Sequence, residues 1–428
     1  MRIGTQISTQ RGGDLRAWSL LAAVGLGVWI VVDLTGRAFF GAVPWPQSVV
    51  DYRIIYEASR HVYQTHAFPV HSPYPYPPPA IALHAASAIF PFSVAAALWL
   101  ILTGCAAVAV YAIVAAMLDL HRRPGGLWVL PLAHLGVAYY FQWDFRSINC
   151  NVLVLAAIVL GVVALRAERG GIAGFWLALA VALKLIPVLL LPYLAWTHRW
   201  RALRAALVFS AFFWVVLPLI AFGPEGFVPV YAGWYDELTR ATNAATKDTH
   251  PILISLTKAA QAAFPENAAA TVVGSMIAAW VVLGLVGAWT SWRLRTANSE
   301  TLLTHTSLVV IGPAAVNPYL EPYHLVALVL PSLLLVAAAT DSRRPVHVRA
   351  VAAVGFVAAL VIVKLSSPWP LRGLVVNLQA LVLCATALIV ARRPSSATAD
   401  RRAEPRWPFV HRLPRWLPQS VGVPSQHG

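Results

Sequence analysis

The sequence predicts an all-α, polytopic integral membrane protein, and two observations support this prediction. Of the 428 residues, 59% are hydrophobic and 11% are charged, and the mean hydropathy is +0.67. A soluble domain carries about 25% charged residues. The apolar residues also gather in repeated tracts that are long enough to cross a bilayer as helices of about 20 residues each.

The basic residues are distributed as the topology of a membrane protein requires. The net charge is +15, and when alternate connections are assigned to two sides, one side collects 22 of the 32 Lys and Arg residues but, with Asp119 counted beside its connection, 7 of the 17 acids. The positive-inside rule makes that side cytoplasmic. We therefore interpret the charge as a topology signal with some affinity for membrane lipids, and we expect no nucleic-acid partner. The connections on this side are 2–16, 121–123, 166–169, 198–204, 293–300, 341–349 and 392–415.

Hydropathy divides the chain into three parts. Residues 1–16 are expected to be a cytoplasmic segment, 17–391 the membrane domain, and 392–428, rich in Arg, Pro and Ser, a disordered basic cytoplasmic tail. The membrane domain is expected to hold about 11–13 transmembrane or re-entrant helices, with long external loops at 36–79 and 223–267. We expect the first span to be retained rather than cleaved. Spans are expected near 17–35, 127–142, 151–166, 202–222, 268–290, 302–317, 324–340, 349–365 and 372–391.

Two apolar tracts contain residues that interrupt helices. In the tract 80–118, Pro91 and the side assignment favour a short or re-entrant helix at 80–90 followed by one long span. The tract 172–197 contains Lys184 in its middle and has basic residues at both ends, which favours two half-helices that enter and return. Broken helices are tolerated at membrane depth where they line a protein-enclosed cavity. We therefore expect this break to line a reaction chamber.

The first external loop concentrates ionisable and aromatic residues between two apolar segments. A carboxylate at a lipid-facing rim can accept a proton from an acceptor hydroxyl without a metal, so Asp51 is the candidate general base. The alternative is an interfacial aspartate paired with Arg53 or Arg60. Tyr76, in the stretch YPYPPPA, could stack against a sugar or simply suit the membrane interface.

Further polar residues lie at the ends or in the middle of apolar segments. Asn149 and Asn151 could hydrogen-bond sugar hydroxyls or cap the helix that follows. Lys184 lies between two leucines and needs a partner, either a lipid phosphate or a neighbouring carboxylate. His324 could contact a donor phosphate, orient the acceptor or be an ordinary interfacial histidine.

The second external loop and the cysteines give less information about function than the residues above. Tyr235 and Asp236 are candidates for acceptor selection, although most charged loop residues are simply solvated. The three cysteines, Cys105, Cys150 and Cys384, show neither paired spacing nor a metal pattern. We therefore predict no metal site and no cofactor.

Five motifs, taken in order, resemble the bacterial polyprenol-phosphate-mannose-dependent mannosyltransferases of glycosyltransferase family 87, which have the GT-C fold. The resemblance covers residues 15 to 390, and its specific part is the order and spacing of the motifs. The motifs are VVDYRIIYEAS at 49–59, YPYPPPA at 74–80, INCNVLVL at 148–155, ALKLIP at 182–187 and NPYLEPYHLV at 317–326.

The resemblance implies an enzyme of the plasma membrane with an extracytoplasmic active site. Such an enzyme moves mannose from polyprenyl-phosphate mannose to a glycolipid or lipoglycan acceptor, of phosphatidylinositol mannoside or lipomannan type, with inversion at the anomeric carbon. Asp51 then corresponds to the family's general base, and Lys184 and His324 to donor-phosphate ligands. Arg53 is expected to assist them.

Two other function classes fit parts of the pattern. A secondary transporter or lipid flippase would also use broken helices and a buried charge, although such proteins commonly contain inverted repeats and none is visible in the sequence. A non-catalytic membrane scaffold of the cell envelope is the third possibility. A long ionisable first loop is poorly explained by transport, so the sequence favours the enzyme.

Overall fold

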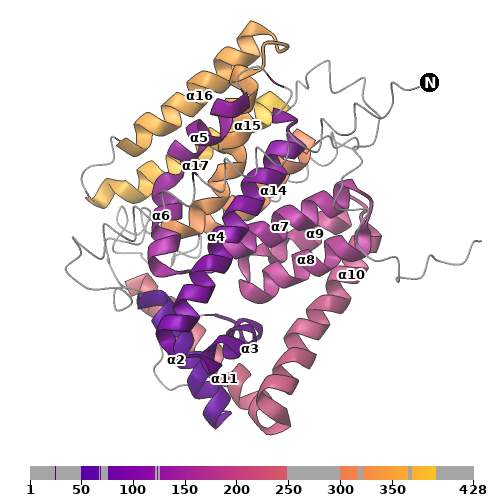
Figure 1. Ribbon diagram of the computed structural model, residues 1–428, viewed down its shortest axis with the longest axis vertical. Coiled ribbons are helices and arrows are strands. Elements are labelled where there is room, and N and C mark those ends of the chain that lie inside the picture. The colour runs from indigo at the N-terminus through magenta and orange to yellow at the C-terminus, as the bar shows by residue number, and fades with distance from the viewer. Residues whose placement is uncertain are drawn as a thin grey trace, which may run out of the picture.

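The described part of the chain is built from helices packed into one bundle (Figure 1). This computed structural model describes residues 25, 50–66, 68, 76–120, 123, 126–247, 299–316, 322–364 and 369–391. No strand occurs among these residues. The helices are α2 (Val50–Thr65), α3 (Pro78–Ala85), α4 (Phe92–Met117), α5 (Gly126–Leu135), α6 (Ala138–Ser147), α7 (Asn151–Arg166), α8 (Gly170–Leu183), α9 (Leu190–Trp196), α10 (Trp200–Ala211), α11 (Leu217–Lys247), α14 (Ser299–Val316), α15 (Val329–Thr340), α16 (Val346–Lys364) and α17 (Trp369–Ala391).

The lengths and composition of the helices confirm the predicted all-α membrane fold. Two helical stretches, Phe92–Met117 and Trp200–Arg240, are long and apolar enough to cross a membrane, and the pair α6 and α7, bent by 118°, passes the same test together. Several shorter apolar helices surround them. The spans expected near 17–35 and 268–290 and the expected terminal segments 1–16 and 392–428 lie outside the described residues, apart from Gly25.

The break predicted in the tract 80–118 is confirmed. Pro77 is extended, and α3 begins at Pro78, where a proline is tolerated because the first helical N–H has no intrahelical partner. A short 3₁₀ turn, Ala86–Ile89, follows α3, and Pro91 then precedes the 26-residue helix α4. The tract is therefore one short helix followed by one long span.

The two half-helices predicted in the tract 172–197 are also confirmed. Helix α8 ends at Leu183, Lys184 is extended (φ −155°, ψ 135°), and α9 resumes after one 3₁₀ turn, Ile186–Leu189. The two ends of the tract meet, since the Arg199 guanidinium donates to the Leu165 carbonyl over 3.5 Å. This segment is therefore a hairpin whose tip carries Lys184.

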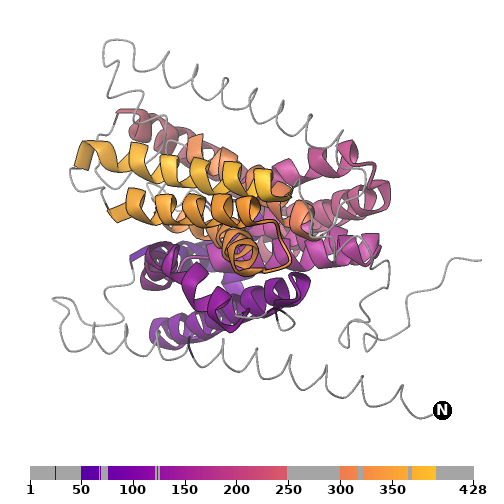
Figure 2. The ribbon, with the colours of Figure 1, turned by 90° about the horizontal axis from the view of Figure 1, so that it is seen from above.

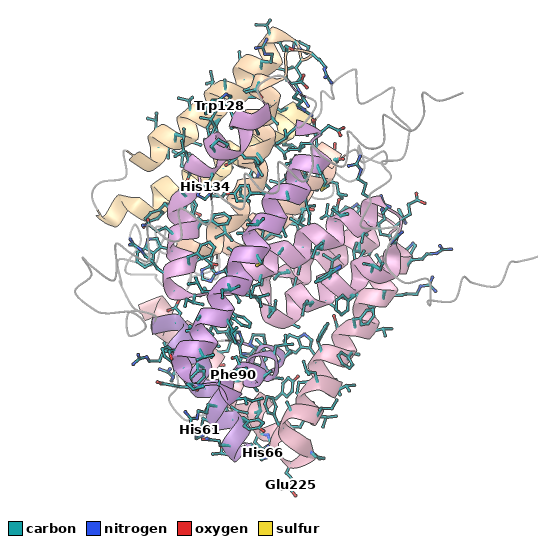
Figure 3. All side chains as sticks on the ribbon, viewed as in Figure 1. His61, His66, Phe90, Trp128, His134 and Glu225 are labelled. Carbon is teal, nitrogen blue, oxygen red and sulfur yellow. The ribbon has the colours of Figure 1, made fainter. Side chains whose placement is uncertain are left out.

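Both segments expected to be external loops contain helix. Within 36–79, α2 has a buried apolar face and a solvent-facing polar face, which stabilises a surface helix. Within 223–267, α11 continues to Lys247 after a reversal at Gly223, whose φ of 71° and ψ of 169° are adopted almost only by glycine. Figure 3 shows the end of α2, at His66, beside Glu225 at this reversal.

The helical parts of these two segments pack together around α3. Their shared core joins residues that lie up to 175 positions apart (55 to 230), and burial of these apolar groups stabilises the packing by about 25 cal/mol per Å². The expectation that both segments lie on the same side of the membrane domain therefore agrees with their contact. The core consists of Ile55, Ala58, Val62, Phe68, Ile81, Ala82, Phe222 and Val230.

The stretch expected as one span near 127–142 is divided in two. Helix α5 ends at Leu135, and α6 begins at Ala138 and extends to Ser147. A Cβ atom at Gly136 would lie 3.0 Å from the Phe356 ring, so this turn depends on a close approach to α16. The expected external connection between 142 and 151 is consequently reduced to three residues, 148–150.

A buried cluster of four charges joins helix ends at the opposite end of the bundle. Arg344 binds both carboxylate oxygens of Glu300, at 2.6 and 2.5 Å, and Arg123 contacts Glu300 at 3.5 Å and Asp341 at 3.2 Å. All four side chains are at most 7% exposed, and the two charges of each sign balance. The charge count had assigned the connections that carry these residues to one side, and the structure brings them together.

The C-terminal helices complete the bundle. Figure 2 shows helices α14 to α17, coloured orange to yellow, stacked against the N-terminal helices coloured indigo to purple.

Helix α14 carries an unusual number of buried polar residues near its start. The hydroxyls of Thr304, Thr306 and Ser307 each donate a hydrogen bond to the carbonyl four residues earlier in the same helix.

We predict that Gly174→Ala destabilises the protein by about 1–3 kcal/mol because of overpacking. A Cβ atom there would lie 2.5 Å from the backbone nitrogen of Ala206 and 2.7 Å from the carbonyl oxygen of Ala202 on α10. Gly171→Ala is the matched control on α8, because a Cβ atom at that position meets nothing within 4 Å. Thermal unfolding in detergent should separate the two variants, and equal melting temperatures would contradict close packing of α8 on α10.

Candidate active site

The junction between α6 and α7 gathers polar side chains in the interior. Ile148 has a left-handed conformation (φ 48°, ψ 50°), and the N–H of Asn149 donates to the Asp144 carbonyl over 3.0 Å, which closes the end of α6. A β-branched residue rarely adopts this conformation, and such strain costs about 1–3 kcal/mol. The strained turn makes the 118° bend and brings Asp144, Asn149 and Asn151 side by side.

Asp51 is held by the first of these amides. The Asn149 Nδ2 donates to Asp51 Oδ2 over 3.2 Å, and Asn149 Oδ1 accepts from the Tyr76 hydroxyl over 2.9 Å. The same oxygen also accepts from the backbone N–H of Cys150 over 2.8 Å. Asn149 is fully buried, so its amide is oriented by these partners: the oxygen faces three donors and the nitrogen faces the carboxylate.

The second amide connects this group to Lys184. The Lys184 ammonium donates to Asn151 Oδ1 over 2.6 Å and lies 5.6 Å from the centre of the Tyr76 ring, within cation–π range. Asn151 Nδ2 donates to Asn149 Oδ1 over 3.0 Å and to Asp144 Oδ1 over 2.8 Å. One continuous chain of hydrogen bonds therefore links the carboxylate of Asp51 to the ammonium of Lys184.

Lys184 and His324 line the same small cavity. Its volume of about 30 Å³ is enough for one or two water molecules and too small for a hexose. The His324 side chain is partly exposed, and its residue belongs to the 3₁₀ turn Pro322–Leu328 that precedes α15. The other lining residues are Asn151, Val154, Leu155, Ile158, Ile186, Pro187, Val310, Val326 and Ala327.

Two buried tyrosines, Tyr52 and Tyr56, follow Asp51 on α2. The Tyr52 hydroxyl donates to Ser87 over 3.2 Å, and burial raises the pKa of Tyr52 above its ordinary value of 10. The Tyr56 hydroxyl donates to the Phe90 carbonyl over 2.7 Å. At neutral pH Tyr52 is therefore a hydrogen-bond donor, and Asp51 beside it is a group on this part of α2 that can accept a proton.

Three of the predicted site residues lie apart from this hydrogen-bond network. Arg53 lies with its guanidinium carbon 5.1 Å from the centre of the Phe92 ring, and its position two residues after Asp51 turns it to another face of α2. Tyr235, with 66% of its side chain exposed, and the exposed Asp236 lie on α11. The predicted residues that the network or the cavity does bring together are Asp51, Tyr76, Asn149, Asn151, Lys184 and His324.

Asp144 is the site residue that the sequence reasoning missed. The spans expected near 127–142 and 151–166 place it in the external connection between them, but α6 continues through it and its side chain is completely buried. Its carboxylate accepts from Asn151 Nδ2 and, over 3.4 Å, from the backbone N–H of Val152 at the start of α7. The available signal was its position between Trp143 and Phe145, two aromatic residues that favour burial.

Of the two roles considered for the asparagines, capping of the following helix is represented in part. Asn149 accepts the N–H of Cys150 at the start of α7, and Asn151 is the first residue of that helix without capping it by its own side chain. Within the described residues no group of three or more His, Cys, Asp or Glu side chains lies close enough to hold a metal ion.

Comparison with known protein families shows which family the chain belongs to. The family model described as "Glycosyltransferase family 87" matches residues 74–316, which is more than half of the chain. The chain belongs to glycosyltransferase family 87. It is therefore a glycosyltransferase of the GT-C membrane class. No curated protein and no solved structure matches it.

Membership of family 87 confirms the prediction of an enzyme rather than a transporter or a scaffold. The matched range is shorter than residues 15 to 390, the range over which the sequence motifs resemble this family. It contains Tyr76, Asn149, Asn151 and Lys184, whereas Asp51 and His324 lie on either side of it. The structure nevertheless joins Asp51 to the matched part through the bond to Asn149.

We predict that Tyr76→Phe lowers the free energy of unfolding by about 0.5–1.5 kcal/mol, because one neutral hydrogen bond is lost while Asn149 Oδ1 keeps two other donors. Tyr63→Phe, with 55% of its side chain exposed on α2, is the control and should change stability little. Chemical unfolding in detergent measures both. Two indistinguishable variants would show that the Tyr76 bond contributes nothing.

Proposed function

We propose that this family 87 enzyme is an inverting mannosyltransferase. Its donor is polyprenyl-phosphate mannose, and its acceptor is a glycolipid or lipoglycan of phosphatidylinositol mannoside or lipomannan type. The observation that supports this proposal is the hydrogen-bond chain from Asp51 through Asn149 and Asn151 to Lys184, because it holds a base and a cation in one unit. Transfer from a phosphate leaving group to a hydroxyl needs these two groups.

The reaction is a single displacement at the anomeric carbon. The acceptor oxygen forms a bond to this carbon while the bond from the carbon to the phosphate oxygen breaks. Asp51 takes the proton of the acceptor hydroxyl, and the electron pair of the broken bond leaves with the polyprenyl phosphate. Because attack and departure occur on opposite faces of the sugar, a β-linked donor gives an α-linked product.

Lys184 and His324 stabilise the charge that develops on the departing phosphate. Both line the cavity beside α7, and the ammonium of Lys184 is oriented by Asn151. The cavity is too small for the sugar, so we assign it to phosphate oxygens or to the waters they replace, with the sugar towards Asp51 and Tyr76. For Arg53 to act on the same phosphate, its side chain has to leave the Phe92 ring and turn towards Asp51.

The acceptor approaches along the helical part of the second external segment. Tyr235 and Asp236 are exposed on α11, which packs against α2 and α3 through a shared apolar core. An exposed tyrosine can stack on a sugar ring, and a carboxylate can accept hydrogen bonds from sugar hydroxyls. The lipid tails of both substrates remain in the bilayer at the plasma membrane, and the active site faces the extracytoplasmic side.

We predict that Asp51→Asn lowers mannose transfer by about 10²–10⁴-fold, the range that a general base contributes. The measurement is transfer of labelled mannose from polyprenyl-phosphate mannose to endogenous glycolipid in membranes with equal amounts of each variant. Glu57→Gln is the matched control, since it makes the same change of charge at an exposed position of α2 and should leave transfer unchanged.

The outcomes of this experiment separate the parts of the proposal. Undiminished transfer by Asp51→Asn would remove Asp51 as the base. Transfer by the unaltered protein from a different polyprenyl-phosphate sugar, but not from the mannose donor, would show that the donor sugar is not mannose.

We predict that cysteines placed at the two ends of the bundle label from opposite sides of the membrane. In a Cys105→Ala background, Thr65→Cys on α2 should react with a membrane-impermeant maleimide in right-side-out vesicles, and Ser342→Cys, beside the buried charge cluster, in inside-out vesicles. Both positions are exposed, while Cys150 and Cys384 are buried. The reverse pattern would place Asp51 in the cytosol, away from the proposed donor.

A further inference from the structure

We propose that Asp144 is a positioning residue that fixes the orientation of the Asn151 side-chain amide. Through this amide it holds the side chains of Lys184 and Asp51 in the positions that the transfer reaction needs. The inference rests on the proposed functions of these two residues. Asp144 itself is completely buried, and it is not among the residues that line the cavity, so it acts through its neighbours rather than on the substrate.

The first step is the direction of the Asn151 amide. Its Nδ2 faces the Asp144 carboxylate at 2.8 Å, and its Oδ1 faces the Lys184 ammonium at 2.6 Å. An amide turned the other way would set its oxygen against the carboxylate and its nitrogen against the ammonium, leaving both contacts repulsive. Both oxygens of Asp144 act as acceptors, Oδ1 towards Asn151 Nδ2 and Oδ2 towards the Val152 N–H, so this arrangement permits one orientation of the Asn151 amide.

The second step is the transmission of this orientation to Asp51. With Asn151 fixed, its Nδ2 also reaches Asn149 Oδ1 at 3.0 Å. Asn149 must then keep its oxygen towards this donor and its Nδ2 towards Asp51, at 3.2 Å. The orientation of the Asn151 amide therefore determines that Asn149 presents its Nδ2 to Asp51, the proposed base.

The third step is that an asparagine at position 144 cannot replace the aspartate. The two carboxylate oxygens accept from different donors, Oδ1 from Asn151 Nδ2 and Oδ2 from the Val152 N–H. An amide of the same shape has one oxygen, so one of these donors would face an NH₂ group. Satisfying Asn151 would leave the Val152 N–H unpaired, and satisfying Val152 would favour reversal of Asn151.

The test is a double-mutant cycle between Asp144→Asn and Lys184→Met. Asp144→Asn alone should lower transfer by about 100-fold, the order expected when a reacting group is displaced by about 1 Å. In the Lys184→Met background the same change should lower transfer less, because the ammonium that Asn151 positions is already absent and only the effect through Asn149 on Asp51 remains. Equal fold-losses in both backgrounds would overturn the proposal.

Asp341→Asn is the matched control for loss of a buried carboxylate. Asp341 is as buried as Asp144 but belongs to the charge cluster with Arg123 at the other end of the bundle. Its effect should be the same in the unaltered protein and in the Lys184→Met background, as expected for distant sites. Coupling of Asp341 to Lys184 as strong as that of Asp144 would show a general loss of folding and would also overturn the proposal.

The same cycle measured as chemical unfolding without substrate separates this proposal from the proposed function. If Asp144 and Lys184 are coupled in stability but the unaltered protein transfers no mannose, the positioning network is supported and the proposed mannosyltransferase activity is contradicted. Normal transfer by the unaltered protein, with no coupling in either measurement, would remove the role of Asp144 and leave the mannosyltransferase intact.

Discussion

The structure depends on the hydrogen bond between the Asn149 amide and the carboxylate of Asp51. This bond joins α2 to the junction of α6 and α7 across 98 positions of sequence, and the rest of the polar network continues from the same amide. A buried polar group that lacks a partner costs about 1–3 kcal/mol, so the amides can occupy the interior because each has its donors and acceptors matched. The requirement that these buried amides be paired makes the arrangement specific.

Three segments that form the site lie where a helix is interrupted. Ile148 turns the chain in a left-handed conformation, Lys184 is extended between two half-helices, and His324 belongs to a 3₁₀ turn. Interruptions of this kind free backbone groups and redirect side chains into the interior, and they are tolerated at membrane depth where protein encloses them. Regular apolar helices surround these breaks and keep the site inside the bundle.

The helices are held together by different interactions at the two ends of the bundle. At one end α2, α3 and the second part of α11 pack through an apolar core, which leaves polar faces available for a substrate. At the other end Arg123 and Arg344 pair with Glu300 and Asp341 and also contact the carbonyls of Ala337 and Val390. Paired charges that also bind helix C-termini hold the connections together without a net charge in the interior.

Local properties of the sequence were enough to predict the membrane fold and the interruptions at Pro91 and Lys184. Prolines and charges in apolar tracts act on the chain where they occur, so their effect can be inferred without knowing the fold. Family resemblance added the chemistry. The helices in 50–65 and 223–247 were not expected, because α2 and α11 are stabilised by packing against each other and α3.

Partnership between distant side chains could not be inferred in this way. The sequence determined that Lys184 needs a partner, and left a phosphate or a carboxylate as candidates. Only the tertiary structure decided that Asn151, 33 residues earlier, receives its ammonium and that Asp144 is buried behind this amide. Hydropathy and charge describe how each segment meets the bilayer, whereas the pairing of buried polar groups depends on which helices pack together.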